Sequence, residues 1–265
     1  KDPSGFLGKP KMPAYKKNDR CTYTFSNQDA VLYPVRDKSG SFTGMELKLP
    51  LTRKRIFMPH LTEDARLMEV KVKPYYGRYI LSLAIQTEDV PINPDMPETA
   101  AVDFGTDNIA AIVCTDYSSR IYKGGAVLSY NRWFHKKRAK AVSIITKGHE
   151  HMYADSKYLR NLSFHHANFN LDQMHKVSTD IIRFCLQHRV GTLVLGVNKQ
   201  WKQCVNIGKA NNQSFVSMPI TLLRALITYK AAMHGIIVIE QEESYTSKAD
   251  ICAMDYIPTY GVDDE

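Results

Sequence analysis

The stretch AVDFGTDNIAAIV at residues 101–113 consists of two apolar runs joined by a tight turn, and the first run delivers one carboxylate, Asp103, into that turn. A carboxylate in a buried strand loses hydration unless a cation or hydrogen-bond donors compensate. Gly105 lets the backbone turn there, or lets a ligand come close. An aspartate in this position suits Mg²⁺, which takes one or two carboxylates and leaves its other sites to water and phosphate oxygens. The local pattern leaves a second interpretation open, in which Asp103 only caps its own turn.

The composition indicates a globular protein with a basic excess. Of 265 residues, 44% are hydrophobic and 10% aromatic, which is enough for packed cores. The 35 Lys and Arg against 27 Asp and Glu give a net charge of +8, which fits a polyanionic partner, although solubility alone accounts for a charge of that size. The chain has no apolar run of about 18 residues, so no membrane partner is predicted.

The cysteines are odd in number, scattered and without C-x-x-C spacing, which predicts neither a disulfide framework nor a zinc site and favours an intracellular setting. They are Cys21, Cys114, Cys185, Cys204 and Cys252. The first residues, starting at Lys1, resemble neither a signal peptide nor a natural initiation site, so we expect the chain to begin inside a longer protein.

Three prolines at 91, 94 and 97 separate two parts with different hydrophobic periodicity, because such a stretch forms neither a helix nor a central strand. The sequence therefore predicts a domain at 1–92, a linker at 93–99 and a second domain at 100–265. In the first domain, Met45, Leu47 and Leu49 alternate with polar residues. Two further alternating runs flank 74–77 (PYYG), a predicted hairpin turn. These short strands indicate a small barrel or sandwich, of the kind that binds oligonucleotides or serves as a plain structural domain.

The hydrophobic pattern of the second domain predicts strands first and helices later. Residues 101–105, 109–115 and 120–128 are expected to form strands, with a turn at 116–119. A long helical region follows, with apolar residues on one face between Leu171 and Phe184, then a strand at 192–195. A second amphipathic helix runs from Pro219 to Gly235, before a fifth strand at 236–239. The fold class is mixed α/β, and the order βββαβαβ is that of the RNase H-like fold, by analogy of pattern.

Six segments, in order, resemble the TnpB (OrfB) family of transposon-encoded RNA-guided DNA endonucleases, relatives of the type V CRISPR effectors. Residues 6–16 resemble the opening of that family's wedge β-barrel, and 103–110 resemble its first RuvC motif, with Asp103. Residues 131–138 (NRWFHKKR) resemble the basic helix start after the third strand. Later landmarks of one TnpB branch are matched by 196–202, 211–215 and 243–248.

The chain departs from the family pattern at the other acidic positions. Many members carry the second RuvC glutamate where this chain has Gly196. In one branch an acidic residue after the fifth strand replaces it, which points to Glu243, with Glu242 as the rival. In a second interpretation, Glu242 and Glu243 are both ordinary solvated side chains in a loop and bind no metal. Strand spacing puts a carboxylate two strands from Asp103 at about 10 Å, so it must lean back to share a metal.

The family's third acidic residue and its zinc-ribbon cysteine pairs have no counterpart in this sequence, so no zinc is expected. Because the family's final segment and its N-terminal recognition lobe are also missing, we expect a truncated chain.

The resemblance implies Mg²⁺-dependent cleavage of DNA matched to a guide RNA, with two Mg²⁺ ions held by Asp103 and Glu243. Its cofactors and partners would be Mg²⁺, guide RNA and target DNA, and its location would be the cytoplasm or nucleoid of a prokaryote-like host. Basic, aromatic and amide side chains are the candidates for holding nucleic acid. They are Lys9, Lys11, Tyr15, Lys16, Arg53, Lys54, Arg55, Arg132, Lys136, Lys137, Arg138, Asn198, Lys199, Trp201, Lys202, Asn212 and Gln213.

Two functional hypotheses remain open. The first is an RNA-guided endonuclease, favoured because the Asp103 turn is intact. The second is a nuclease-dead descendant that binds DNA through a guide RNA and represses transcription, which the glycine at 196 and the lack of a third aspartate support. A DNA-strand transferase is less favoured, because no Tyr nucleophile accompanies a paired His motif. The oligomeric state is not indicated by the sequence.

Overall fold

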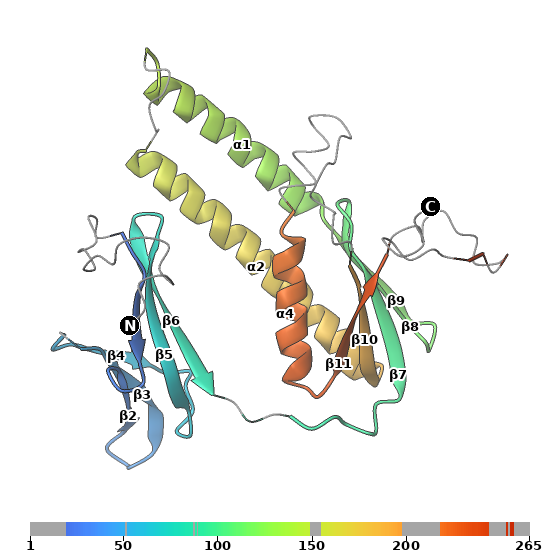
Figure 1. Ribbon diagram of the computed structural model, residues 1–265, viewed down its shortest axis with the longest axis horizontal. Helices are drawn as coiled ribbons and strands as arrows, with labels where there is room; N and C mark the ends of the chain where they lie inside the picture. Colours follow the sequence, from blue (N-terminus) through green and yellow to red (C-terminus); the bar gives the residue numbers. More distant parts are fainter. Residues whose placement is uncertain are drawn as a thin grey trace, which may run out of the picture. The chain divides into compact units, whose positions relative to one another are not determined.

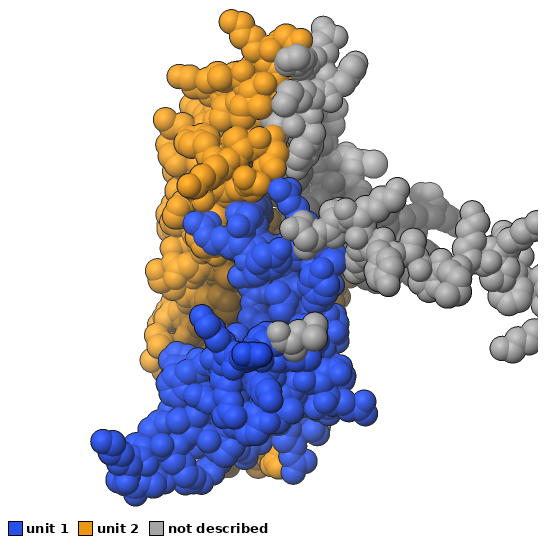
Figure 2. Space-filling view, turned by 90° about the vertical axis from the view of Figure 1, so that its left-hand side faces the viewer, with its two compact units in different colours: residues 1–87 blue, residues 88–265 orange. Residues whose placement is uncertain are grey.

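The computed structural model describes residues 20–50, 52–86, 88, 90–148, 155–197, 218–243, 253 and 255–256. The chain divides into two compact units, Lys1–Thr87 and Glu88–Glu265, which are coloured separately in Figure 2. The break between these units falls a few residues before the predicted linker at 93–99.

The first unit is all β. Its strands pair into two three-stranded antiparallel sheets, ordered β1-β5-β6 and β2-β3-β4. Ala30, Leu47 and Val70 are its most buried side chains. Whether the two sheets close into the predicted wedge-type barrel stays a prediction. The strands are β1 (Tyr23–Ser26), β2 (Val31–Arg36), β3 (Phe42–Lys48), β4 (Arg55–Met58), β5 (Arg66–Tyr75) and β6 (Arg78–Gln86).

The predicted hairpin joins β5 to β6. Tyr75 pairs with Arg78, so the loop contains only Tyr76 and Gly77. Both have positive φ, 48° and 79°, as a type I′ turn requires at its two central residues. Gly77 adopts this conformation without strain, and the turn sets the register of the whole hairpin.

The second unit is a five-stranded sheet with helices. The strand order is β11-β10-β7-β8-β9; β10 runs parallel to β7 and β11, and β8 is antiparallel to β7 and β9. The order of elements is βββααβαβ, a mixed α/β arrangement. The elements are β7 (Glu98–Asp103), β8 (Asn108–Cys114), β9 (Ser119–Lys123), α1 (Gly125–Ile145), α2 (Lys157–Gln187), β10 (Val190–Val197), α4 (Ile220–Ala232) and β11 (Ile237–Glu242).

Two sequence predictions need correction here. The strand expected at 120–128 ends at Lys123, because the chain turns at Gly124, whose N–H donates to Asp107 O at 2.7 Å, and α1 then begins. A Cβ at Gly124 would collide with the Thr106 carbonyl, so the turn needs glycine. Glu98 and Thr99, assigned to the linker, are already in β7, where they pair with Val190 and Thr192 of β10.

One face of this sheet forms the core. Alternate residues of β7 (Ala100, Val102) and β10 (Leu193, Leu195) are buried against helices α2 and α4, which lie on the same side of the sheet in Figure 1. Because side chains alternate across a strand, the residues between them, including Ala101 and Asp103, lie on the opposite face. Ala101 and Asp103 are exposed there.

The two long helices pack on each other beyond the sheet. Helix α2 has 31 residues, about 46 Å, whereas β10 has 8, about 26 Å, so α2 outruns the sheet and pairs with α1 (Figure 1). His166 Nε2 hydrogen-bonds the buried Asn131 Oδ1 at 2.7 Å, and its ring stacks on Phe134 at 3.8 Å. Burial lowers the pKa of His166, so this histidine joins the helices in its neutral form.

Helix α4 is tied to α2 by a half-buried lysine. Lys230 Nζ donates to Ser178 Oγ and Thr179 Oγ1, both at 2.7 Å, and to His175 O at 3.0 Å. Ser178 is fully buried. Burial lowers the pKa of the Lys230 ammonium, so its three acceptors offset part of the cost of desolvating it.

We expect Lys230→Met to lower the free energy of unfolding by about 1 to 3 kcal/mol, because it leaves buried acceptors unpaired. The control is Lys176→Met, which removes an exposed ion pair to Asp172 on α2 and should change stability by less than about 0.5 kcal/mol. Urea unfolding of the two variants checks this. Equal effects would contradict a structural role for the Lys230 contacts.

Candidate catalytic site

Asp103 is the last residue of β7; its side chain is exposed and lies on the sheet face opposite the buried core. The sequence interpretation of a desolvated carboxylate inside a buried strand is therefore wrong, because the alternation that buries Val102 turns Asp103 outward. Within the described part of the chain, its carboxylate accepts no hydrogen bond, so the turn-capping interpretation finds no support either. A solvent-facing carboxylate at a strand end is instead open to a ligand.

The neighbouring strand places Gly196 beside Asp103. Leu195 of β10 pairs with Val102, so the next step along both parallel strands brings Gly196 level with Asp103. On the other side, Gly196 pairs with Gln241 of β11. Level residues of adjacent strands share a face, so Asp103, Gly196 and Gln241 form one row across the open face.

Glu243 extends this row from the end of β11. Its N–H donates to Val197 O at 3.1 Å, which continues the strand pairing by one step. Two residues after Gln241, it returns to the same face, whereas the rival Glu242 falls on the other in this alternation. The carboxyl group of Glu243 lies above Gly196: a Cβ added at position 196 would overlap its Oε1 and Cδ atoms. Because Gly196 of β10 has no side chain, the Glu243 side chain can extend over β10 toward β7.

The charge of Asp103 acts on Glu243. Burial, followed by the negative charges of Asp103 and Glu242, raises the pKa of Glu243 to about 7, and Arg224 opposes them. A cation bound between two carboxylates relieves the repulsion between their negative charges. The pair is thus electrostatically poised for a cation.

Arg224 was not identified by sequence reasoning. It lies on α4, and its Nη2 donates to Glu240 Oε1 of β11 at 2.5 Å. The guanidinium thereby links the helix to the edge strand three residues before Glu243, and it also lowers the pKa of that glutamate. The signal in the sequence is that Arg224 is one of two cations on a largely apolar helix.

The two carboxylates fit a hard divalent cation. Mg²⁺ needs only one or two of them, with water and substrate phosphate in its other positions. Among the residues that the structure describes, no group of three or more His, Cys, Asp or Glu side chains is arranged to hold a metal. Asp103 and Glu243 therefore suit an open site that a substrate completes, and a third acidic ligand stays a prediction.

The predicted nucleic-acid residues fall into three sets. Arg132, Lys136, Lys137 and Arg138 are exposed on α1. Arg53 and Lys54 are exposed before β4, whereas Arg55 pairs with Glu46 at 3.3 Å and covers the Tyr33 ring at 4.5 Å. The remaining candidates lie outside the described residues: Lys9, Lys11, Tyr15, Lys16, Asn198, Lys199, Trp201, Lys202, Asn212 and Gln213.

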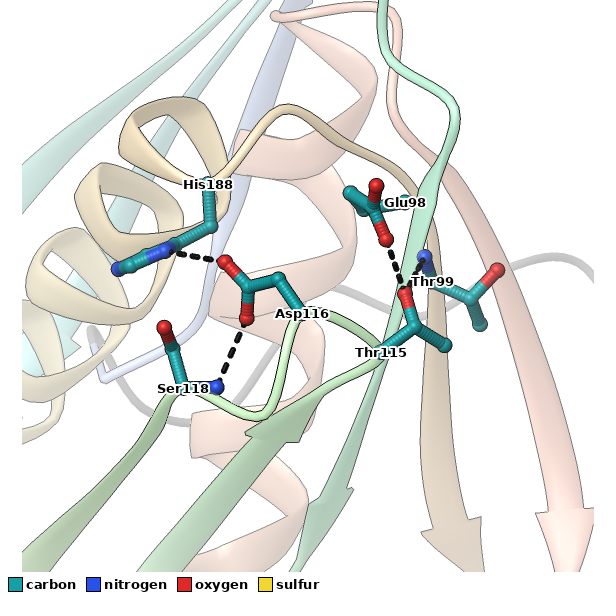
Figure 3. Close-up of polar contacts among 6 residues, drawn as sticks. All are labelled: Glu98, Thr99, Thr115, Asp116, Ser118 and His188. Carbon is teal, nitrogen blue, oxygen red and sulfur yellow. Dashed lines mark hydrogen bonds and ion pairs between the residues drawn. The ribbon is translucent and has the colours of Figure 1, made fainter.

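A second polar cluster lies at the opposite end of β7 (Figure 3). Asp116 accepts hydrogen bonds from the Ser118 N–H at 2.8 Å and from His188 Nδ1 at 2.7 Å, and these bonds lower the pKa of its carboxyl to about 2. Thr115 donates to Glu98 and accepts from the Thr99 N–H at 3.1 Å. These groups satisfy one another, so the cluster joins the β8–β9 turn to the end of α2 and the start of β7, and it is not a candidate site.

We expect Glu243→Gln to become more stable than the native chain as pH rises. The folded-state pKa of about 7 exceeds the unfolded value near 4.5, so the native carboxyl adds no cost below pH 4.5 and its full cost above pH 7. In chelator, the variant should gain about 1 to 2 kcal/mol relative to native between pH 5 and pH 8, after a discount for solvent screening. Urea unfolding at both values measures the gain, and the exposed Glu88→Gln serves as control. A gain that is the same at both pH values would contradict the electrostatic account.

Comparison with known proteins gives two matches that bear on the fold and family. The family model OrfB_IS605, described as a probable transposase, matches residues 82–202. No curated protein sequence matches the chain. No described helix has the length and apolar character needed to cross a membrane.

Among solved structures, the chain is similar to a Cas12f1–sgRNA–target DNA complex, with a TM-score of 0.53 and 14% identity over 86% of this chain and 51% of that one. A second similar structure is a CRISPR–Cas12f ternary complex, with a TM-score of 0.41, 13% identity, and 84% and 50% coverage. The chain thus spans about half the length of the solved proteins that it matches. The OrfB_IS605 match confirms the resemblance to the TnpB (OrfB) family that the sequence predicts, and the similarity to the Cas12f1 chain shows a similar fold.

Proposed function

We propose that this chain carries the cleavage site of an RNA-guided, Mg²⁺-dependent DNA endonuclease of a transposable element, with Asp103 and Glu243 as its acidic pair. The observation that carries the proposal is the position of the Glu243 carboxyl above Gly196, on the face and in the row of Asp103. In this proposal Glu243 supplies the carboxylate that the fourth strand lacks.

The sheet topology supports this reading. Three antiparallel strands followed by two parallel ones, in the order β11-β10-β7-β8-β9, agree with the RNase H-like (RuvC) arrangement expected from the sequence. In that arrangement the first strand holds an acidic residue at the centre of the sheet. Here β7 is the central strand, and Asp103 stands at its end.

The chemistry follows from the exposed carboxylates. Bound Mg²⁺ would supply an activated water and charge stabilisation for hydrolysis of a phosphodiester. The Asp103 carboxylate accepts no hydrogen bond from the described residues, so it needs no rearrangement to bind a cation. Glu243 must lose its proton to bind, and Arg224 favours that loss. The exposed cations of α1 would hold the nucleic-acid backbone, while base pairing with a guide RNA selects the sequence.

The alternative is a nuclease-dead, RNA-guided repressor. In its favour, the described residues include no group of three or more acidic, His or Cys side chains that could hold a metal, whereas the resemblance implies three acidic residues. Against it stands the cost of the arrangement: Glu243 is held half-buried against the charge of Asp103, which a binding protein gains nothing from keeping.

The nuclease proposal predicts loss of cleavage in Asp103→Ala and Glu243→Ala. The protein is purified with its cellular RNA, the RNA is sequenced to define the guide, and matched double-stranded DNA is offered with Mg²⁺. Each variant should cut at least about 100-fold more slowly, while binding the matched DNA as tightly as the native protein. Glu242→Ala is the matched control and should retain cleavage. Tight binding by the native protein without any cleavage would establish the repressor.

A glycine substitution tests the path of Glu243. Gly196 has no positive φ, so alanine fits its backbone, yet the added Cβ would displace the Glu243 carboxyl. Gly196→Ala should therefore lose cleavage about as severely as Glu243→Ala. Gly125→Ala, at an open position on α1, should have no effect.

The reciprocal exchange makes this test sharper. Gly196→Glu combined with Glu243→Ala moves the carboxylate to β10 and should restore part of the lost rate. Gly196→Glu alone crowds two glutamates into one space and should not increase cleavage. Full activity of Gly196→Ala would show that Glu243 does not act from this position.

A further inference from the structure

A hollow of about 450 Å³ lies where the end of α1 meets the start of α2. Its volume is within the range of about 300 to 1,000 Å³ that is typical of small-ligand sites. No residue of the Asp103 and Glu243 site lines it. The lining side chains are Lys137, Lys140, Ala141, Ile144 and Ile145 of α1, with Ser156 and Tyr158.

The lining is apolar and aromatic at its centre. Ile144 is 66% exposed and Tyr158 is 55% exposed, which is unusual for two large side chains that face the same hollow. In the described part of the chain, the Tyr158 ring has no aromatic partner and its hydroxyl no hydrogen bond. One flat face is therefore available for stacking.

The rim is cationic. Helix α1 contains no Asp or Glu, and Lys136, Lys137, Arg138 and Lys140 are exposed on it. None of these four forms an ion pair with another described residue. By contrast, two cations of α2 have acidic partners: Arg160 pairs with Asp155, just before the helix, at 3.3 Å, and Lys176 pairs with Asp172 at 2.6 Å. Unpaired cations beside an exposed apolar floor match a ligand that has both anionic and flat aromatic parts.

We propose that this hollow binds one unpaired nucleotide of an RNA strand, an inference that rests on the proposed function because it assumes an RNA partner. The base stacks on Tyr158 above Ala141 and Ile144, and the adjoining phosphates contact Lys137 and Lys140. Duplex nucleic acid cannot present a base in this way.

Ser156 directs the assignment to RNA. Its Oγ accepts a hydrogen bond from the Leu159 N–H at 3.1 Å, which leaves its own proton free to donate. A ribose 2′-hydroxyl is the acceptor that RNA offers and DNA lacks. The hollow thus combines a stacking ring, a phosphate rim and one donor for the sugar.

The test measures binding of a labelled oligouridylate by fluorescence anisotropy, in chelator and on the Asp103→Ala protein, so that catalysis plays no part. Tyr158→Ala should weaken binding about tenfold, and Tyr158→Phe should remain within about twofold of the parent. Tyr117→Ala, which removes a tyrosine that is 96% exposed in the β8–β9 turn, is the matched control and should have no effect. Lys137→Gln with Lys140→Gln should reduce the slope of log affinity against log salt by about 1.4.

The outcomes separate this inference from the proposed nuclease. Equal affinities of Tyr158→Ala and Tyr117→Ala would overturn the hollow as a nucleotide site, whatever the cleavage assays give. Oligothymidylate bound as tightly as oligouridylate would overturn the RNA assignment. A parent protein that binds neither strand would overturn both this inference and the RNA partner. Binding that depends on Tyr158 in a protein that never cleaves DNA would support the inference and overturn only the nuclease.

Discussion

The absence of a side chain at Gly196 is the constraint on which the candidate site depends. Glycine stands on β10, between the strand that carries Asp103 and the strand that leads to Glu243. Any larger residue there would occupy the space of the Glu243 carboxyl, and the two acidic groups would be separated by a full strand. Two interactions hold the edge strand β11 in place: its pairing with β10 and the Arg224 contact to Glu240.

The division of the sheet into two faces determines where chemistry is possible. Leu193, Leu195 and Val102 bind the sheet to α2 and α4, so one face contributes stability. The opposite face keeps its polar row accessible, and the strand period of two separates these roles without any special residue. A single register slip of β7 would exchange Val102 and Asp103, burying the charge and exposing the core.

Much of this fold could be predicted from the sequence, because the signals were local. The PYYG turn, the strand at 192–195, and the Pro219 start and Gly235 end of the last helix all depend on backbone preferences or short-range periodicity. The sequence does not reveal that β9 ends before Gly124. Glycine is required there because the Thr106 carbonyl, which is distant in sequence, lies too close for a side chain. The exposure of Asp103 was also mispredicted, since an apolar run does not reveal which of its faces the helices will cover.

The site shows the same limit more sharply. Gly196 looked like the loss of a ligand, and Glu243 like one of two loop acids, because the sequence separates them by 46 positions of unrelated character. Only the pairing of Gly196 with Gln241, and the strand alternation that follows, makes the glycine and the glutamate a single feature. A half-buried glutamate whose ionisation is opposed by a neighbouring aspartate lowers stability in the empty protein, and cation binding would recover that stability. An arrangement that is unfavourable alone and favourable with a cation is typical of function, because stability by itself would favour a neutral side chain in that position.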